Sequence, residues 1–198
     1  MKTFGRVLTA MITSFNDDGS INIKNTVAIA EHLLNHGSDG LVVCGTTGEN
    51  PTMSRESKIA LFKAVAEFCG DKGTIIANVG SNDTKGSVDF VKEVSAIPGI
   101  DGLLVVVPYY NKPNQQGQYL HFKSIAEATT LPIMVYNVPG RVGTGIFPAT
   151  LARLHKEYPH ICAIKEASGN LMIASEIKRL MPGDDFMVYS GDDGLTLP

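Results

Sequence analysis

The chain has 198 residues, of which 43% are hydrophobic and 19% charged, so it can bury a sizeable core and is not expected to be disordered. Its net charge is −3 and its basic residues are scattered, which excludes a nucleic-acid surface and favours a small-molecule partner. Three cysteines, an odd number, do not make a disulfide framework, so we expect reduced, buried thiols at Cys44, Cys69 and Cys162.

The N-terminal stretch Val7-Leu8-Thr9-Ala10-Met11-Ile12 resembles a secretion signal only superficially. A threonine interrupts it, it runs into the turn Asn16-Asp17-Asp18-Gly19, and it has no small-residue cleavage site. No run in the chain approaches the ~18 apolar residues that a membrane helix requires. We therefore expect a soluble, cytoplasmic protein with no membrane partner.

Short apolar runs rich in Val, Ile, Leu and Met alternate with helical patterns along the whole chain. The runs show little polar alternation, which is typical of strands buried on both faces of a parallel sheet. The predicted strands are residues 6–12, 40–44, 74–79, 102–107, 132–137, 160–165 and 186–190. The predicted helices are residues 23–36, 54–69, 84–96, 116–129, 148–157 and 170–181, and Ser54 is a candidate cap for the second.

This alternation predicts an α/β fold, either a TIM (β/α)₈ barrel or a doubly wound sheet. The unusual residues all follow strands, and in a barrel such loops share one rim where the active site is built. A doubly wound sheet would instead spread them along an edge. We favour the barrel, as one domain over residues 1–198.

Motifs for cofactors and metals are weak. The segment Gly140-Arg141-Val142-Gly143-Thr144-Gly145 has its glycines in the wrong order for a dinucleotide fingerprint. His32 and His36 have the spacing of a metal-ligand pair but no acidic or thiol partner, and Asp192-Asp193 is more typical of a helix cap. Cys44 adjoins a threonine loop, but no base accompanies it. We expect neither a cofactor nor a metal.

The strongest chemical signal is Lys165, which closes the apolar run 160–164. A lysine forms a Schiff base with a carbonyl only as the free amine, and burial favours that neutral form. The alternative is a strand-terminal lysine that reaches out to water. Hydroxyl groups that could relay protons, and amide or guanidinium groups that could hold carboxylates, are predicted on the same rim. They belong to Tyr136, Tyr110, Thr46, Thr47 and Arg141.

These residues stand in an order and spacing that resemble the dihydrodipicolinate synthase family, which belongs to the pyruvate-dependent class I aldolases of the N-acetylneuraminate lyase superfamily. The resemblance runs from residue 1 to residue 198. Because the family's barrel continues with an eighth βα unit and a helical C-terminal region, the resemblance implies one incomplete barrel domain here, truncated after the seventh strand. It implies a lyase that condenses pyruvate with aspartate 4-semialdehyde to 4-hydroxy-tetrahydrodipicolinate in lysine and diaminopimelate biosynthesis. It rests on Gly45-Thr46-Thr47-Gly48-Glu49, Pro108-Tyr109-Tyr110-Asn111, Tyr136-Asn137-Val138-Pro139-Gly140-Arg141, Ile164-Lys165-Glu166-Ala167 and Ser190-Gly191-Asp192-Asp193.

The resemblance also implies a role for each residue. Lys165 would form the Schiff base with pyruvate, and a relay of Tyr136, Thr46 and Tyr110 would move protons. Thr47 and Gly191 would help to bind substrate, and Arg141 would receive the carboxylate of the semialdehyde. The family is generally a homotetramer built as a dimer of dimers, in which Tyr110 would reach into the neighbouring subunit's site.

In feedback-sensitive relatives, lysine binds at the dimer interface. The matching positions here are Lys58, Asn82, Gly86 and Tyr109, and the last of these and Asn82 keep the site's pattern. A cation at Lys58 would repel the inhibitor's ammonium groups, and Gly86 offers them no carboxylate. We therefore expect weak inhibition by lysine or none.

Two other functions stay open at this point. An N-acetylneuraminate lyase or a 2-keto-3-deoxy sugar acid aldolase would share Lys165 and Tyr136. The other alternative is a catalytically inactive, truncated assembly or binding subunit. Arg141 in its sequence context and the paired Tyr109-Tyr110 favour the synthase over the sugar acid aldolases.

Overall fold

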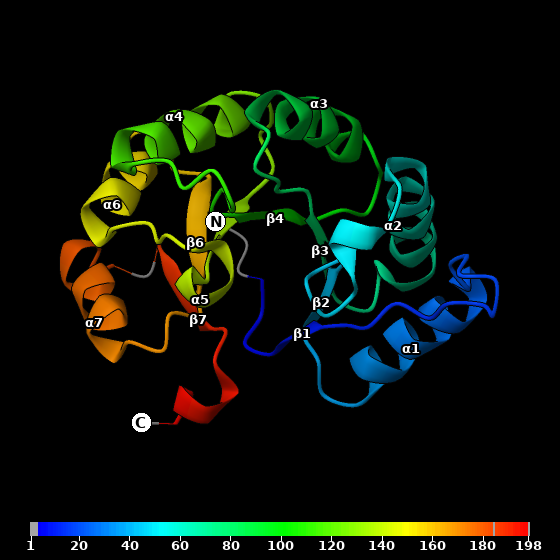
Figure 1. Ribbon diagram of the computed structural model, residues 1–198. Coiled ribbons are helices and arrows are strands. Elements are labelled where there is room, and N and C mark those ends of the chain that lie inside the picture. Colours follow the sequence, from blue (N-terminus) through cyan, green and yellow to red (C-terminus); the bar gives the residue numbers. More distant parts are fainter. Residues whose placement is uncertain (1–3, 184, 198) are drawn as a thin grey trace. The chain divides into compact units, whose positions relative to one another are not determined.

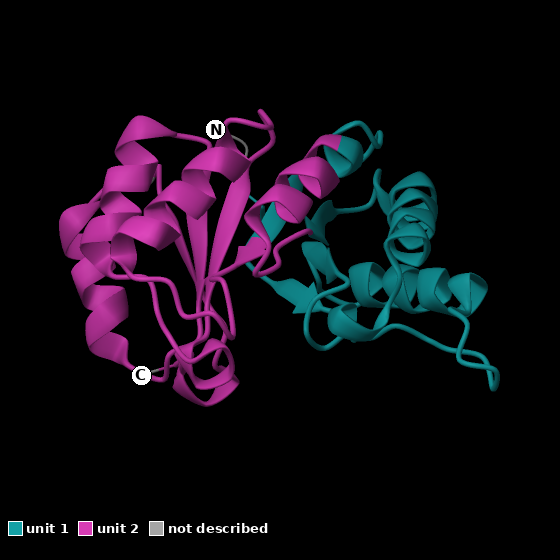
Figure 2. Ribbon diagram, turned by 45° about the horizontal axis from the view of Figure 1, so that its top comes forward, with its two compact units in different colours: residues 1–78, 93–104 teal, residues 79–92, 105–198 magenta. Residues whose placement is uncertain are grey.

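The computed structural model describes residues 4–183 and 185–197 (Figure 1). The chain divides into two compact units, each assembled from separate stretches of sequence (Figure 2). The first unit contains residues 1–78 and 93–104, and the second contains residues 79–92 and 105–198. Helix α3 (Thr84–Ser95) and strand β4 (Gly102–Val106) each contribute residues to both units.

The first unit contains parallel strands with two long helices. Helix α1 packs against α2, and α2 packs against β3. Together with the first residues of β4, its elements are β1 (Leu8–Ala10), α1 (Ile23–Asn35), β2 (Gly40–Val43), the 3₁₀ helix η1 (Asn50–Thr52), α2 (Arg55–Cys69) and β3 (Thr74–Asn78).

The second unit repeats the same alternation. Helix α6 packs against both α4 and α7 and against strand β6, and Figure 1 shows these helices on one side of the strands. Its elements are α4 (Gln115–Ala126), β5 (Ile133–Asn137), α5 (Pro139–Val142), α6 (Pro148–Glu157), β6 (Ile161–Glu166), α7 (Leu171–Leu180), β7 (Met187–Ser190) and η2 (Asp193–Leu195).

Strand order follows the sequence within each unit. In the first unit β1 pairs with β2, β2 with β3 and β3 with β4, all parallel. In the second unit β6 pairs in parallel with both β5 and β7. A doubly wound sheet would place β1 between β2 and a later strand, with a reversal of order beside it. Because β3 pairs with both β2 and β4, the order does not reverse among these strands, and that alternative is wrong.

Local sequence explains where the elements begin. Helix α2 starts after Ser54, whose hydroxyl accepts a hydrogen bond from the backbone N–H of Ser57 at 3.1 Å, so the predicted cap is confirmed. The buried face of α2 consists of Leu61, Phe62, Val65, Ala66 and Cys69, spaced as one helical stripe. Strands β2, β3 and β5 are buried along their whole length, as expected for parallel strands covered on both faces.

Three elements, β1, α4 and α5, differ clearly from the sequence-based expectation. Strand β1 covers only Leu8–Ala10 of the predicted residues 6–12, and Val7 and Ile12 on either side are each 54% exposed. Helix α4 ends at Ala126, because the next amides turn back in tighter bonds, from Ala128 to the carbonyl of Ile125 and from Thr129 to that of Ala126. Helix α5 has no counterpart among the predicted helices, since it is a single turn.

Candidate active site

Lys165 lies near the carboxyl end of β6, one residue before the strand ends at Glu166. Its cross-strand partner on β5 is Tyr136, which is only 7% exposed. The Lys165 Nζ lies 4.8 Å from the centre of the Tyr136 ring. The structure therefore brings together the predicted nucleophile and the predicted relay tyrosine.

The environment of Lys165 favours its neutral amine. Burial lowers the pKa of Lys165 below its usual value, the Arg141 guanidinium lowers it further, and the Asp193 carboxylate opposes both. A lowered pKa increases the fraction of free amine at neutral pH, which is the form that attacks a carbonyl. The half-buried lysine thus has the electrostatics that Schiff-base chemistry requires.

Gly191 lies directly after β7 and beside the nucleophile. Its backbone N–H donates to the carbonyl of Glu166 at 2.7 Å, which continues the pairing of β6 with β7. A Cβ at this position would lie 3.0 Å from both Cγ and Cε of Lys165 and 2.8 Å from the Cβ of Ala167. Only glycine therefore leaves room for the lysine side chain, and the absence of a side chain at Gly191 keeps space open next to the amine.

Arg141 is carried by the single turn α5 directly after β5. The turn begins with Pro139 and ends at Gly143, whose φ of 76° is in the left-handed region that glycine adopts without strain. Arg141 is exposed, and its charge acts on Lys165 from this position. The sequence placed Arg141 in a loop, whereas the structure fixes its backbone in a helical turn close enough to influence the nucleophile.

Tyr109 and Tyr110 differ in exposure, although the segment is not extended at Tyr110. Tyr109 is half-buried, while the side chain of Tyr110 is 88% exposed. Tyr110 also has a φ of 71°, a left-handed conformation that is uncommon for a bulky residue. The structure does not place Tyr110 against Lys165 or Tyr136, so its role in a relay stays a prediction.

Thr46 and Thr47 lie in the loop after β2, in the first unit, and both are exposed. Two non-glycine residues with left-handed backbones bracket this loop, Cys44 with φ 55° and Glu49 with φ 61°. Such conformations cost about 1–3 kcal/mol each and are concentrated at functional sites. The strained loop is therefore a candidate substrate-binding element, and its placement relative to Lys165 stays a prediction.

The buried thiols are poor nucleophiles. All three cysteines are free and buried, as expected. Burial raises the pKa of Cys44 to about 12 and that of Cys162 to about 11, so neither forms the thiolate readily at neutral pH. Cys44 packs beside the strained loop and does not compete with Lys165 for covalent chemistry.

The positions expected to match a lysine site make their own contacts in each unit. In the first unit, the Nζ of half-buried Lys58 donates to Asn50 Oδ1 at 3.2 Å, and burial lowers the lysine's pKa. In the second, the Asn82 carbonyl accepts a hydrogen bond from Asn111 at 3.4 Å, and Gly86 lies so close to Asp83 that an added Cβ would collide with that carboxylate.

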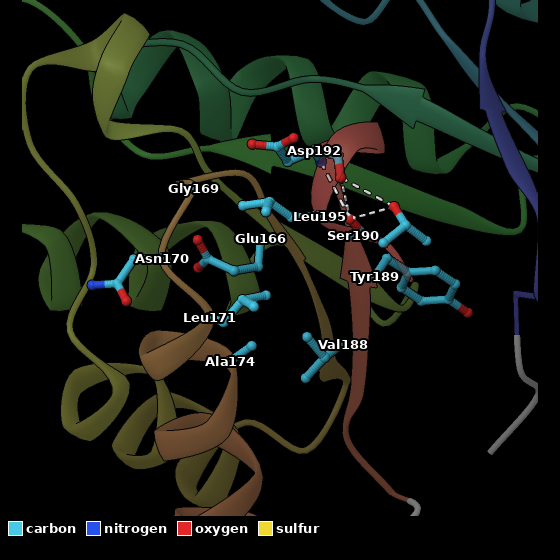
Figure 3. Close-up of a pocket in the computed structure, with 11 residues that line it drawn as sticks. Glu166, Gly169, Asn170, Leu171, Ala174, Val188, Tyr189, Ser190, Asp192 and Leu195 are labelled. Atoms are coloured by element: carbon cyan, nitrogen blue, oxygen red, sulfur yellow. Dashed lines mark hydrogen bonds between the residues drawn. The ribbon is translucent and has the colours of Figure 1, made fainter. Parts of the chain in front are cut away.

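Two functional candidates were not singled out from the sequence. Asn137 and Glu166 end the strands that carry Tyr136 and Lys165, and both are buried. Their position directly after the two chemically active residues was the available signal. Glu166 also lines a cavity of ≈ 210 Å³ at the carboxyl ends of β6 and β7, with residues of α7 and η2 on its other sides (Figure 3). Lys165 points to the opposite face of the strand.

No group of three or more His, Cys, Asp or Glu side chains in residues 4–183 and 185–197 is arranged to hold a metal ion. Asp192 occupies the N-cap position of η2, as its sequence suggested, but its side chain makes no capping hydrogen bond. Of the helices that the structure describes, none combines the length and the apolar character that a membrane span needs.

Comparison with known sequences gives a consistent result. The model of the dihydrodipicolinate synthetase family matches residues 3–198. A 4-hydroxy-tetrahydrodipicolinate synthase of Desulforamulus reducens is 52% identical over 195 residues, and one of Moorella thermoacetica is 53% identical over the same length. Each alignment covers 98% of this chain, whereas the chain spans only 65% and 66% of these curated relatives.

Solved structures agree. The crystal structure of dihydrodipicolinate synthase from Bacillus anthracis matches with a TM-score of 0.96 and 46% identity, covering 100% of this chain and 67% of that one. A dihydrodipicolinate synthase from Cyanidioschyzon merolae with lysine bound matches with a TM-score of 0.94 and 44% identity, covering 98% and 66%. These matches confirm the predicted fold class, a (β/α)₈ barrel represented here through its seventh strand. The chain belongs to the dihydrodipicolinate synthase family.

Proposed function

We propose that the protein condenses pyruvate with aspartate 4-semialdehyde to 4-hydroxy-tetrahydrodipicolinate, as a cytoplasmic enzyme of lysine and diaminopimelate biosynthesis. The observation that supports this most strongly is Lys165, a half-buried amine with a lowered pKa, 4.8 Å from the Tyr136 ring at the end of β6. Two relatives that are 52% and 53% identical over 98% of this chain carry the name of this synthase.

The proposed chemistry begins at the Lys165 amine. The amine attacks the keto carbon of pyruvate, and the resulting carbinolamine loses water to give an iminium ion. Loss of a methyl proton converts the iminium to an enamine, whose carbon attacks the aldehyde of the second substrate, and the aldehyde oxygen takes up a proton as the alcohol. The amino group of the semialdehyde then attacks the regenerated iminium carbon, which closes the ring and releases the Lys165 amine. Tyr136, with Thr46 and Tyr110, would carry the protons that these steps exchange.

Binding of two carboxylates accompanies this chemistry. The exposed loop at Thr47 and the open space at Gly191 would accommodate pyruvate beside the lysine. The exposed guanidinium of Arg141, on the turn after β5, would pair with the carboxylate of the semialdehyde. Both interactions leave the Lys165 amine free to react.

The test is reduction by borohydride in the presence of pyruvate, followed by intact mass and peptide mapping. We expect one reduced pyruvyl group, attached at Lys165, on the protein in its full length. Lys58 is a matched control, because it is also half-buried with a pKa lowered by burial but lies on helix α2, where its amine donates to Asn50. Modification that persists in Lys165→Ala contradicts the assignment, and absence of any adduct favours the inactive subunit.

The aldolases for sialic or sugar acids are the second candidate class. They share the Schiff-base step, so trapping with pyruvate does not separate them from the synthase. Arg141 in its observed position favours a second substrate with a carboxylate, as the semialdehyde has. Turnover of N-acetylneuraminate or a 2-keto-3-deoxy sugar acid in preference to the semialdehyde would overturn our choice.

We also propose a homotetramer, a dimer of dimers, in which Tyr110 enters the site of a second copy. The exposure of Tyr110 and its strained backbone support this, because a large side chain held outward is well suited to contact a partner. Mixing inactive Tyr110→Phe subunits with Lys165→Ala subunits should restore some activity in hybrid dimers. Hybrids that form but stay inactive would exclude a shared site.

A further inference from the structure

Asn137 and Glu166 form a buried polar pair that the proposed reaction steps do not use. Asn137 is 0% exposed and Glu166 is 8% exposed. The amide nitrogen Nδ2 of Asn137 donates a 2.8 Å hydrogen bond to Glu166 Oε2. Removing a partner from a buried carboxylate is costly, so this pair strongly favours the arrangement in which it forms.

The pair extends to two neighbouring segments. The other carboxylate oxygen of Glu166, Oε1, accepts the backbone N–H of Ser168 at 2.7 Å. The amide oxygen of Asn137 accepts the backbone N–H of Ile146 at 3.2 Å, in the segment that follows α5. Asn137 and Glu166 thereby connect the ends of β5 and β6 with two segments, the one that follows the turn of Arg141 and the one that follows β6.

Register makes this connection important for the nucleophile. Asn137 lies opposite Glu166, and the preceding cross-strand pair is Tyr136 opposite Lys165. Because successive side chains point to opposite faces, the two pairs lie on different faces of the same strand ends. A slip of one residue would turn Lys165 to the other face and separate its amine from the Tyr136 ring.

Backbone pairing alone fixes this register weakly at the other end of the strands. Ile133 lies opposite Ile161, but the next residue, Met134, lies opposite Ala163, so Cys162 is an extra residue in β6. Such an irregularity interrupts the ladder of hydrogen bonds and bends the strand. The register at Lys165 therefore depends on contacts made beyond the irregularity, toward the carboxyl ends.

We propose that Asn137 and Glu166 are positioning residues that hold β5 in register with β6 and keep the Lys165 amine beside Tyr136. Asn137 and Glu166 affect the reaction by positioning Lys165 and Tyr136. Asn137 also holds the segment that follows the turn of Arg141, by its hydrogen bond to Ile146. This inference rests on the proposed Schiff-base function of Lys165.

A reciprocal exchange tests the proposal. In Asn137→Asp two carboxylates face each other, and in Glu166→Gln a second amide group faces either Asn137 or the N–H of Ser168. In the double variant the new glutamine donates to the new aspartate, while its oxygen still accepts the Ser168 N–H and the aspartate still accepts the Ile146 N–H. All three hydrogen bonds are thus restored with the negative charge moved to position 137.

The readout is the rate of borohydride-trapped imine formation at saturating pyruvate, taken at its alkaline limit, where the amine is neutral in every variant. We expect each single variant to lose about ten- to a hundredfold, the worth of a hydrogen bond to a charged group, with a smaller change in half-saturating pyruvate. The double variant should return to within about threefold of the parent, since the two sites are coupled. If the variants acted only through their charge, the rate would rise in one single variant and fall in the other, because one adds a negative charge and the other removes one. That result would contradict the proposal.

Asn78 provides a matched control. It is also the last, buried residue of a strand, and its Nδ2 donates to the carbonyl of Cys44 at 2.8 Å rather than to a carboxylate. When Glu166→Gln is added to Asn78→Asp, the two losses in the rate of imine formation should therefore multiply, and the rate should not return toward that of the parent. A double variant of Asn137 and Glu166 that is equally multiplicative would overturn the proposal.

Acetylation of the parent and variants by acetic anhydride, without pyruvate, separates the two proposals. If the parent protein forms no pyruvate adduct, the Schiff-base function fails, but acetylation still reports the setting of the amine. We expect the limiting rate of Lys165 acetylation to change in both single variants and to return to the parent value in the double variant. Equal rates in all four proteins would show that Asn137 and Glu166 do not position the lysine.

Discussion

Lys165 and Cys44 are both nucleophilic side chains at the carboxyl ends of parallel strands, and burial affects their reactivity in opposite ways. Burial disfavours the charged form of each group, so it lowers the pKa of Lys165 and raises that of Cys44 to about 12. The neutral amine is the reactive form of lysine, whereas the charged thiolate is the reactive form of cysteine. Burial thus activates the lysine and makes the cysteine unreactive.

Exchanging each nucleophile for alanine gives the largest expected contrast. Lys165→Ala should reduce turnover by about a thousandfold or more, because it removes the covalent anchor of the reaction. Cys44→Ala, in the first unit, should retain turnover within about threefold, since the thiol is packed and protonated. The measurement is kcat for the condensation in the protein in its full length. Comparable losses in both variants would contradict the distinction.

The next prediction concerns which of the two substrates Arg141 binds at the Lys165 site. Arg141→Ala should raise the KM for aspartate semialdehyde by about ten- to a hundredfold, the contribution of a charge-assisted pair, and change the KM for pyruvate much less. Steady-state kinetics with each substrate varied in turn will measure both values. Equal increases for the two substrates would argue against a carboxylate contact with the semialdehyde.

Lys58 is a second half-buried lysine whose pKa burial lowers, but we expect its effect to concern regulation. Lys58 would repel the ammonium groups of lysine, and Gly86 offers them no carboxylate. Compared with a site that has such a charge pair, lysine binding should be weaker by more than about tenfold, so half-inhibition should lie above about 1 mM. Lysine titration of the activity will measure it. Lys58→His should increase sensitivity, and strong inhibition of the unaltered protein would refute the expectation.

The smallest effects are shifts in pH dependence, and they have opposite signs. The rate of imine formation should rise with pH through the lowered pKa of Lys165, as the ammonium loses its proton. Arg141→Ala removes a charge that lowers this pKa, so the profile should move to higher pH. Asp193→Asn removes a charge that raises it, so the profile should move to lower pH. Shifts in the same direction would contradict the charge arrangement.

Much of the fold was predictable because parallel strands buried on both faces have a continuous apolar signature. Helix α6 has the predicted bounds, Pro148–Glu157, and strands β2 to β7 lie within one residue of the predicted ends. The exceptions are short or irregular. A three-residue strand such as β1 and a single turn such as α5 contain too few residues for a periodic pattern to define their ends.

Sequence alone was sufficient to predict the family, the alternation of strands and helices, and the position of Lys165 at the end of an apolar strand, because these depend on residues close together in the chain. The folded chain was needed to show that Tyr136 lies opposite Lys165, that Gly191 leaves room for the lysine, and that Arg141 and Asp193 act on its pKa. It also revealed the hydrogen bond between Asn137 and Glu166. Register, burial and charge proximity join residues far apart in sequence, and no local pattern encodes them.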